Sequence, residues 1–334
     1  MQSTVTAYQQ PTPIPPIFTP ERSEFLAERK TGIGGSDAAV ILGLSKYKTP
    51  LELAEEKLGL TPPFEGNRFT EAGNRLEDVI AQWYADEQGC RVARANQTFR
   101  LKEHDFIMAH IDRRVLKERK VLECKSADKW TLNNWGQPGT DEIPDAYFIQ
   151  VQHYLMFPNW DSADLAALIG GNDLRIYPIL PDYELQEMML ESEIAFWKII
   201  ERGDLPDPIR ESDANKLWSR DNGESIYADY AVVEWHEELK KAVVAEKELK
   251  AKMDDLKTRI KSFMQEYSIL CDPDGKKIRT WKIQKTSSFR EQELVSTYPE
   301  IYERCLQPKF DRNVCKQEFP AIYQEFQTTG RVFR

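Results

Sequence analysis

The chain has 334 residues, a formal net charge of -10 at pH 7 and five cysteines. Its length suffices for one large domain, or for a medium domain with an appendage, and either can bury a complete hydrophobic core. The negative net charge argues against a protein that coats nucleic acid through its overall charge. It does not exclude an enzyme that binds cations among carboxylates and confines its basic residues to a groove.

The N-terminal part of the chain begins with a proline-rich lead. Residues 1–20 contain five prolines among polar residues, so we expect them to be extended or disordered and to lie outside the fold. A short helix is predicted at residues 36–42. The following helix starts with a capping box, in which Thr49 is the N-cap, Pro50 the first helical residue and Glu52 the third.

An amphipathic helix at residues 70–88 precedes a run of predicted strands. Apolar side chains recur at helical spacing in this helix, and Gly89 supplies the stop. Strands are expected at residues 91–95, 97–101, 106–111, 114–116, 121–125, 163–168 and 174–179, with helices at 145–157 and 184–201. This order predicts an α/β core over residues 21–208, with helices around a central sheet.

The chain changes character after the prolines at positions 206 and 208. A long charged helix is predicted at residues 232–267, followed by a hairpin around residues 272–275. Residues 209–334 are therefore expected to form a helical and β-hairpin appendage, to which the sequence assigns no role.

The most informative pattern is Asp112, ten intervening residues, and then Glu123, Cys124 and Lys125. If the two strands form a hairpin, side-chain alternation puts Glu123 and Lys125 on one face, which Asp112 can reach from the partner strand. Two carboxylates that bind Mg²⁺ can neutralise phosphoryl oxygens and activate water, and the Cys124 carbonyl is a further candidate ligand. Lys125 can orient or deprotonate the water. The alternative is a surface hairpin with a cross-strand ion pair.

Neighbouring helices add polar side chains to this pattern. Glu77 lies one turn past Gly73 and supplies a possible third carboxylate. Gln150 and Tyr154 share one face of the helix after the strands, whereas Gln152 points elsewhere. Each of these residues taken singly is as well explained by an ordinary structural role.

A candidate anion site lies upstream, where the glycines of RKTGIGGSDAAV let the backbone turn its amides toward a ligand. Gly34 and Gly35 precede Ser36, the predicted cap of the following helix, and Arg29 could supply a fork to the same phosphate. An ordinary tight turn is the alternative. The motif is not a nucleotide-binding Walker A loop, because Lys46 lies too far from the glycines.

Two clusters of basic residues indicate either nucleic-acid contacts or solvated charged faces. The first comprises Arg113, Arg114, Lys117, Arg119, Lys120, Lys125 and Lys129. The second comprises Lys276, Lys277, Arg279, Lys282, Lys285 and Arg290, with Trp281 and Phe289 among them.

The cysteines are scattered and form no C-x-x-C pair, as expected for reduced thiols of a cytoplasmic protein. This spacing disfavours zinc and iron-sulfur sites. The sequence contains neither an apolar run long enough to span a membrane nor a visible signal peptide, so no membrane association is expected.

Taken together, the ordered blocks GIGGSDAAVILGLSKYKTPLELAEEKLG, EAGNRLEDVIAQWY, HIDRRV with VLECKS, and YFIQVQHYLMF resemble the YqaJ-type viral recombinases, relatives of phage lambda exonuclease in the PD-(D/E)xK superfamily. The resemblance implies a restriction-endonuclease-like three-layer core with a central mixed sheet flanked by helices. It further implies Mg²⁺-dependent digestion of duplex DNA from the 5′ end, with Mn²⁺ as a substitute, leaving 3′ single strands for an annealing recombinase.

By the same resemblance, each candidate residue receives a role. Asp112 and Glu123 are implied as metal ligands supported by Glu77, Lys125 acts on the attacking water, and Gln150 or Gln152 completes the motif. Arg29 and Ser36 match the pair that grips the 5′ phosphate. A homotrimeric ring around DNA is implied as well.

One residue departs from the pattern, because family members commonly have glycine after the first catalytic aspartate and this chain has Arg113. Two other functions remain open. The same core could act as a structure-specific or nicking endonuclease, or the chain could be a non-catalytic DNA-binding recombination module.

Overall fold

The computed structural model describes residues 27–62, 64, 66–95, 97–283, 296–305 and 316–325. The proline-rich lead at residues 1–20 lies outside these ranges. The chain divides into two compact units between Ser219 and Arg220.

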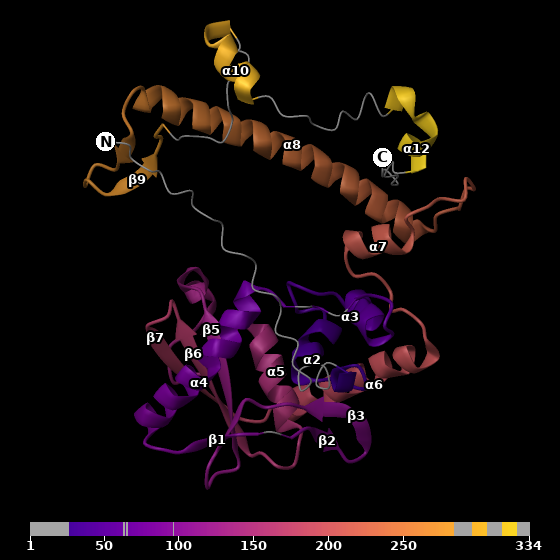
Figure 1. The fold of residues 1–334 in the computed structure, drawn as a ribbon, viewed down its shortest axis with the longest axis vertical. Coiled ribbons are helices and arrows are strands. Elements are labelled where there is room, and N and C mark those ends of the chain that lie inside the picture. The colour runs from indigo at the N-terminus through magenta and orange to yellow at the C-terminus, as the bar shows by residue number, and fades with distance from the viewer. Residues whose placement is uncertain are drawn as a thin grey trace. The chain divides into compact units, whose positions relative to one another are not determined.

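A five-stranded mixed sheet forms the centre of the first unit, with strand order β1-β4-β5-β6-β7 (Figure 1). The strands are β1 (Val92–Arg94), β4 (Arg113–Val115), β5 (Lys120–Ala127), β6 (Ser162–Ile169) and β7 (Asp173–Ile179). β5 and β6 run parallel, whereas the other neighbouring pairs are antiparallel. The predicted hairpin between the strands around the Asp112 to Lys125 pattern is confirmed, since β4 and β5 pair directly.

Helices cover both faces of this sheet (Figure 1). α4 (Arg68–Gln88) packs against β5, β6 and β7 on one face, and α5 (Asp145–Leu155) packs against β6 on the other. α2 (Gly35–Ile41) contacts α5, α3 (Pro50–Lys57) and α6 (Tyr183–Arg202). The predicted α/β core, with a central mixed sheet between helical layers, is confirmed.

Side-chain alternation decides what each face of the sheet buries. Val121 of β5 and Leu165 of β6 face α5, while Leu122 and Cys124 face α4 beside Tyr84. A strand covered on both faces favours apolar residues on both sides, which explains the apolar run from Leu165 to Ile169 of β6. The buried Asp164 of the same strand accepts a hydrogen bond from the Tyr84 hydroxyl. The odd-numbered residues of β5, including Glu123 and Lys125, therefore share the α5 side.

Local sequence signals set the helix ends as expected. Thr49 accepts a hydrogen bond from the Glu52 amide, the Glu52 carboxylate accepts one from the Thr49 amide, and Pro50 opens α3. Gly89 closes α4 in the left-handed region, with φ 61°, which a residue with a side chain adopts only at a cost.

One part of the sheet differs from the prediction. β2 (Phe99–Leu101) and β3 (His104–Ala109) form their own two-stranded sheet instead of joining the central one. The edge of β3 is occupied by the loop before α2, since the Ile33 amide donates to the Phe106 carbonyl at 2.7 Å and the Met108 amide donates to the Ile33 carbonyl at 2.8 Å. A 3-10 helix, η1 (Lys129–Asn134), follows β5 and was not predicted either.

α7 (Glu211–Leu217) belongs to the first unit, although the sequence placed residues 209–219 in the C-terminal appendage. Its Asp213 accepts a hydrogen bond from the Thr49 hydroxyl at 3.0 Å, and Lys216 forms an ion pair with Glu55. These contacts to α3 join segments that are distant in the sequence, so chain composition could not reveal them.

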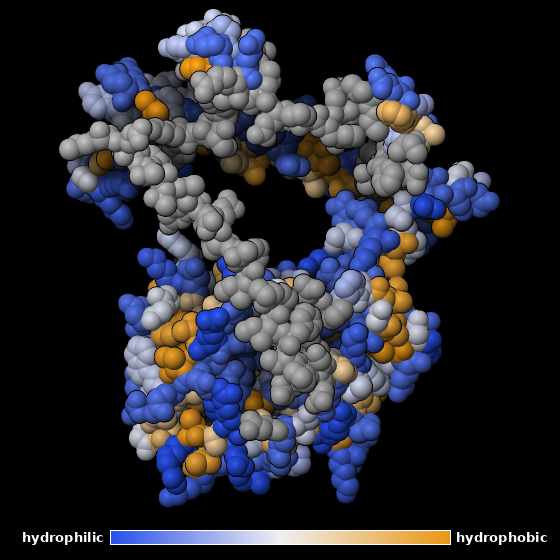
Figure 2. Space-filling model, in the orientation of Figure 1, coloured by the Kyte–Doolittle hydropathy of each residue, from blue (hydrophilic) through white to orange (hydrophobic). Residues whose placement is uncertain are grey.

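The second unit contains a 35-residue helix, α8 (Tyr230–Met264), and the hairpin β8 (Ile269–Cys271) and β9 (Lys277–Thr280). Both elements were predicted. Two short helices follow, α10 (Pro299–Cys305) and α12 (Pro320–Glu325). The described surface of both units is mostly hydrophilic, with patches of apolar side chains (Figure 2). No helix in the described ranges has the length and apolar character needed to cross a membrane.

Gly35 is required by a close approach between α2 and α5. A Cβ atom at this position would lie 2.6 Å from Cε1 of Tyr154 and 3.1 Å from the carbonyl oxygen of Gln150. At Gly34, the nearest atoms would lie 3.9 Å away, which is ordinary contact, and its φ of -103° suits any residue.

We therefore expect Gly35→Ala to lower the free energy of unfolding by about 1–3 kcal/mol, because Tyr154 is buried and cannot move aside freely. Gly34→Ala is the matched comparison and should lower it by no more than about 1 kcal/mol, the cost of alanine at an N-cap. Urea unfolding followed by circular dichroism measures both values. Equal losses in the two variants would contradict this assignment.

Candidate active site

The candidate site forms where β4 separates from β5. The pairing of β4 with β5 ends at Arg113 and Leu122. The next amide of β5 that points toward β4 is that of Cys124, and it finds no carbonyl partner on β4. The Asp112 carboxylate takes that place, and its Oδ2 accepts the Cys124 N–H at 2.8 Å. The end of a backbone ladder thus fixes one carboxylate beside the strand that carries the second.

Glu123 is the second carboxylate, and its side chain is 2% exposed. Its Oε1 accepts from the Lys125 ammonium at 2.6 Å and from the Gln150 amide at 2.8 Å. Gln150 also donates to the Tyr154 hydroxyl at 2.8 Å. The predicted face shared by Gln150 and Tyr154 therefore points at Glu123.

The remaining oxygen of Glu123, Oε2, is buried and has no hydrogen-bond partner. An unpartnered carboxylate oxygen in the interior is costly, which marks it as a donor for a ligand of positive charge. Burial, and then the charge of Glu123, raise the pKa of Asp112 well above its usual value. The two carboxylates therefore repel each other and would both be stabilised by a cation.

Lys125 lies beside this pair with its side chain 21% exposed. Burial by itself lowers the pKa of Lys125, but the carboxylates of Glu123 and Asp112 outweigh it and raise the pKa above its usual value. Its ammonium also lies 5.1 Å from the ring centroid of Tyr147. Lys125 therefore stays charged at neutral pH.

Glu77 of α4 is held by Arg113, the residue that departs from the family pattern. The guanidinium of Arg113 also binds Asp78 of α4 and the carbonyl oxygen of Asp112, and its side chain is only 4% exposed. Arg113 thus ties α4 to the turn before β4. The Glu77 carboxylate is engaged by this cation, whereas the carboxylates of Asp112 and Glu123 are not.

Gln152 is not part of the cluster. Its amide donates to the Leu180 carbonyl at 2.8 Å, and its oxygen accepts from the Asp182 amide and from Gln186 at the start of α6. All three contacts lie away from Glu123, so Gln150 is the glutamine that the structure brings to the carboxylates.

The donor set fits a divalent cation with oxygen ligands. Within the described ranges, no three side chains of His, Cys, Asp or Glu converge as a metal-binding group. Asp112 and Glu123 provide two carboxylates, and a main-chain carbonyl can complete such a set for Mg²⁺. Because the N–H and C=O of one residue point to the same side of a strand, the Cys124 carbonyl faces the side on which Asp112 lies.

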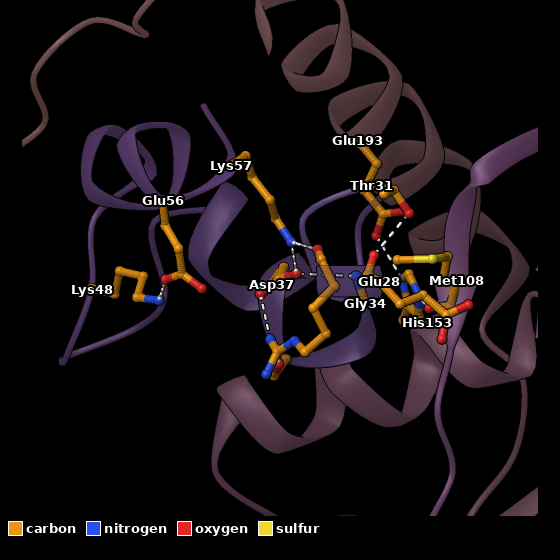
Figure 3. A network of polar contacts seen from close by, with 12 residues as sticks. Glu28, Thr31, Gly34, Asp37, Lys48, Glu56, Lys57, Met108, His153 and Glu193 are labelled. Atoms are coloured by element: carbon orange, nitrogen blue, oxygen red, sulfur yellow. Dashed lines mark hydrogen bonds and ion pairs between the residues drawn. The ribbon is translucent and has the colours of Figure 1, made fainter. Parts of the chain in front are cut away.

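The candidate anion site is a buried ion network around Asp37 (Figure 3). Arg29 donates to Ser36 Oγ and to Asp37 Oδ1, both at 2.9 Å. Asp37 Oδ2 accepts from Lys57 at 2.7 Å and from the Gly34 amide at 3.1 Å. Burial by itself raises the pKa of Asp37, but Lys57 and Arg29 lower it well below its usual value.

Two cations around one anion leave this network with a positive charge, and Arg29 is its exposed member, since the Lys57 side chain is 2% exposed. Asp37 and Lys57 were not identified from the sequence. Asp37 directly follows Ser36 in the glycine-rich segment, so its position next to a predicted site residue could have indicated it. The position of Lys57 at the end of α3 became visible only in the fold.

The network and the carboxylates lie on adjoining elements, because Gly35 of α2 packs against Tyr154 of α5. A second buried pair fastens α5 in place. His153 binds Glu193 of α6 at 2.8 Å and the Met108 carbonyl at 2.9 Å (Figure 3). Burial by itself lowers the pKa of His153, but Glu193 raises it above its usual value.

The first basic cluster is largely neutralised in the fold. Arg113 binds Glu77 and Asp78. Arg119 forms an ion pair with Asp161. Lys120 forms ion pairs with Glu118 and Asp164. In the second cluster, the residues from Lys276 to Lys282 lie on or beside the β8–β9 hairpin and are exposed. Lys285, Phe289 and Arg290 lie outside the described residues.

Comparisons with known proteins point to one family. Residues 24–160 match the family described as YqaJ-like viral recombinase domain. The chain is 33% identical to the protein YqaJ of Bacillus subtilis (strain 168) over 294 residues, covering 85% of this chain and 90% of that protein. It is 26% identical over 159 residues to protein R354 of Acanthamoeba polyphaga mimivirus, covering 45% of this chain and 29% of that protein.

Solved structures with a similar fold include an alkaline exonuclease from Laribacter hongkongensis, at 20% identity and a TM-score of 0.45, covering 54% of this chain and 93% of that one. A phage-related exonuclease from Haemophilus somnus 129PT is similar at 21% identity and a TM-score of 0.41, covering 51% of this chain and 94% of that one.

The raised pKa of Asp112 has a consequence for stability in the presence of a chelator. Because the pKa of Asp112 is higher in the folded state than in the unfolded state, ionisation of this carboxyl opposes folding. The resulting loss in the free energy of unfolding is absent below about pH 4, where the group is protonated in both states, and it grows as the pH rises. Asp112→Asn should therefore raise the free energy of unfolding at pH 7 by about 1 kcal/mol, and the gain should vanish near pH 3.5.

Thermal unfolding in EDTA at several pH values measures this effect. Asp141→Asn, at an exposed carboxylate, is the control and should leave stability unchanged at every pH. A destabilised Asp112→Asn protein at pH 7 would contradict the electrostatic repulsion assigned to this pair.

Proposed function

This chain belongs to the YqaJ-like viral recombinase family, and from that premise we propose that it is a divalent-metal-dependent deoxyribonuclease. It hydrolyses linear duplex DNA from 5′ ends and leaves 3′ single strands. The arrangement of Glu123 carries this proposal, because one of its oxygens is bound by Lys125 and Gln150 while the other is buried and has no partner, and because its charge acts on the Asp112 carboxylate.

Asp112, Glu123 and the carbonyl of Cys124 would hold the cation, with Mg²⁺ favoured by the all-oxygen donor set and Mn²⁺ as a substitute. When bound, the cation supplies positive charge to the phosphoryl oxygens and lowers the pKa of a water molecule. Glu77 supports the site through Arg113, whose guanidinium joins the Glu77 carboxylate to the Asp112 carbonyl.

Lys125 acts as a fixed positive charge. Since its pKa is raised, it remains protonated at neutral pH and serves to orient the attacking water and to stabilise negative charge that develops on the phosphate. Gln150 holds Glu123 in place by donating to the same oxygen as Lys125, and Tyr154 fixes Gln150 in turn. The proposed catalytic set is therefore preorganised by α5.

The Arg29 and Ser36 pair would bind the 5′-terminal phosphate. Arg29 is partly exposed and carries the net positive charge of the network, and the Ser36 side chain is exposed beside it. Gly34 and Gly35 bring the backbone of this turn close to the pair. An end-binding site on α2, directly against the catalytic helix α5, favours digestion from an end over internal cleavage.

Two further parts of the proposal rest on family membership. A single-strand annealing recombinase would take up the 3′ strands, and three copies of the chain would form a ring around DNA. Neither the partner nor the ring follows from the geometry of one chain.

Cleavage assays with three DNA substrates test the proposed reaction. We expect Mg²⁺-dependent loss of linear duplex DNA with 5′ phosphates, much slower loss with 5′ hydroxyls, and no loss of closed circles. Asp112→Ala should lower the rate at least about 1000-fold, since it removes a cation ligand. Cleavage of circles would favour the endonuclease, and no cleavage with any divalent metal would favour the binding module.

The end-binding pair has a separate test. Arg29→Met should reduce the preference for 5′ phosphate over 5′ hydroxyl by about 10-fold to 100-fold, because a charge-assisted fork is lost, and Arg29→Lys should restore only part of it. Lys30→Met removes the same charge from the neighbouring residue and should keep the preference. An equal loss in both variants would mean that only general electrostatic attraction is involved.

A further inference from the structure

α8 carries a heptad pattern, with one polar residue in its apolar seam, that the proposed nuclease function does not use. Apolar residues alternate at spacings of three and four along its length, which is the pattern of a coiled-coil seam. The a positions are Val232, Leu239, Glu246, Met253 and Ile260, and the d positions are Trp235, Ala242, Leu249, Leu256 and Phe263. Glu246 is the single polar residue in this seam.

The large side chains of the seam are exposed on the described helix. Trp235 is 64% exposed, Leu249 is 59% exposed and Phe263 is 77% exposed. Apolar patches follow the course of α8 in Figure 2. A 35-residue helix extends about 50 Å, so this stripe is much longer than the scattered apolar residues that a monomer usually exposes.

We propose that α8 pairs with α8 of a second copy of this chain as an antiparallel two-stranded coiled coil. The charges that flank the seam favour a second copy of the chain as the partner, and they favour the antiparallel direction. In an antiparallel pair, g positions face g positions, so Glu238 meets Arg259 of the other copy, and the two-fold symmetry makes this contact twice. In a parallel pair, Lys252 would face Lys257 and Glu238 would face only Val243.

The sizes of the seam residues agree with the antiparallel direction. With a positions opposite d positions, the small Ala242 faces the long side chain of Met253, and Trp235 faces Ile260. A parallel pair would place Ala242 opposite Ala242 and leave a void. It would also place the two Glu246 carboxylates opposite each other in the apolar seam, whereas the antiparallel pair sets each of them against Leu249.

Arg259 already binds Asp255 one turn earlier on the same helix, at 2.9 Å. Its guanidinium has further donors, so a second carboxylate from the other copy can be accommodated. Glu238 is exposed, and a charge reversal at either position alters the surface of α8 without touching a packed core.

The contact is distinct from the trimeric ring of the proposed function. A two-fold contact joins only two copies, because the same surface serves on both. The full-length protein should therefore sediment with twice the chain mass of 38.8 kDa, or six times that mass if rings also form. A monomer, or a trimer alone, at concentrations up to about 100 µM would overturn the pairing of α8, and a dimer would leave the nuclease proposal intact.

Charge reversal in the full-length chain tests the direction. Glu238→Lys and Arg259→Glu should each weaken self-association about tenfold or more, and the double variant should restore it. Glu248→Lys and Lys247→Glu, on the outer face of the same helix, are matched controls and should have no effect. Failure of the double variant to restore association would overturn the antiparallel register.

Lysine cross-linking of a 1:1 mixture of unlabelled and ¹⁵N-labelled protein gives an independent readout. We expect mixed-isotope links between Lys240 and Lys257, which lie close only when the two helices run in opposite directions. Mixed-isotope links that join Lys257 to Lys257 instead would show a parallel pair and overturn the proposal.

Discussion

The candidate site depends on the point at which β4 leaves β5. A central strand must satisfy its backbone amides, and after Leu122 the Cys124 amide finds no carbonyl on β4. The Asp112 carboxylate accepts that hydrogen bond and is thereby fixed next to Glu123. Had β4 continued to pair, Asp112 would lie directly opposite Glu123 as an ordinary cross-strand neighbour, and its carboxylate would not accept the Cys124 amide. The interrupted ladder thus fixes how the Asp112 carboxylate is oriented within an otherwise regular α/β core.

Electrostatic repulsion is the cost of this arrangement. Two carboxylates lie close together in a partly buried position, and the oxygen of Glu123 that faces away from Lys125 has no partner. Stability is given up locally for a set of donors ready to bind a cation, as is common in active sites. Arg113 limits the cost by engaging the third carboxylate, Glu77, which would otherwise add to the repulsion. The arginine that departs from the family pattern therefore has a structural role in this chain.

In the candidate anion site, too, a buried carboxylate is compensated by neighbouring positive charges. Asp37 is a buried anion between Arg29 and Lys57, and the buried lysine leaves Arg29 as the member that solvent can reach. Gly35 lets this turn approach Tyr154, whose hydroxyl accepts from the same glutamine that holds Glu123. Because Gly35 of α2 packs on Tyr154 of α5, a shift of α2 would displace the helix that holds Gln150 against Glu123. The second unit is a separate feature, since the seam of α8 is compatible with self-association and independent of the chemistry.

The sequence by itself determined the regular elements and identified the candidate site residues. Helical periodicity, the capping box at Thr49 and the glycine at position 89 define helices through contacts between near neighbours. The strand-like runs at residues 114–116 and 121–125 predicted the hairpin. Only the tertiary structure decided which glutamine reaches Glu123, where Glu77 and Arg113 point, that β2 and β3 leave the central sheet, and that α7 returns to α3. These outcomes depend on contacts between residues far apart in the chain, and no local periodicity records such contacts.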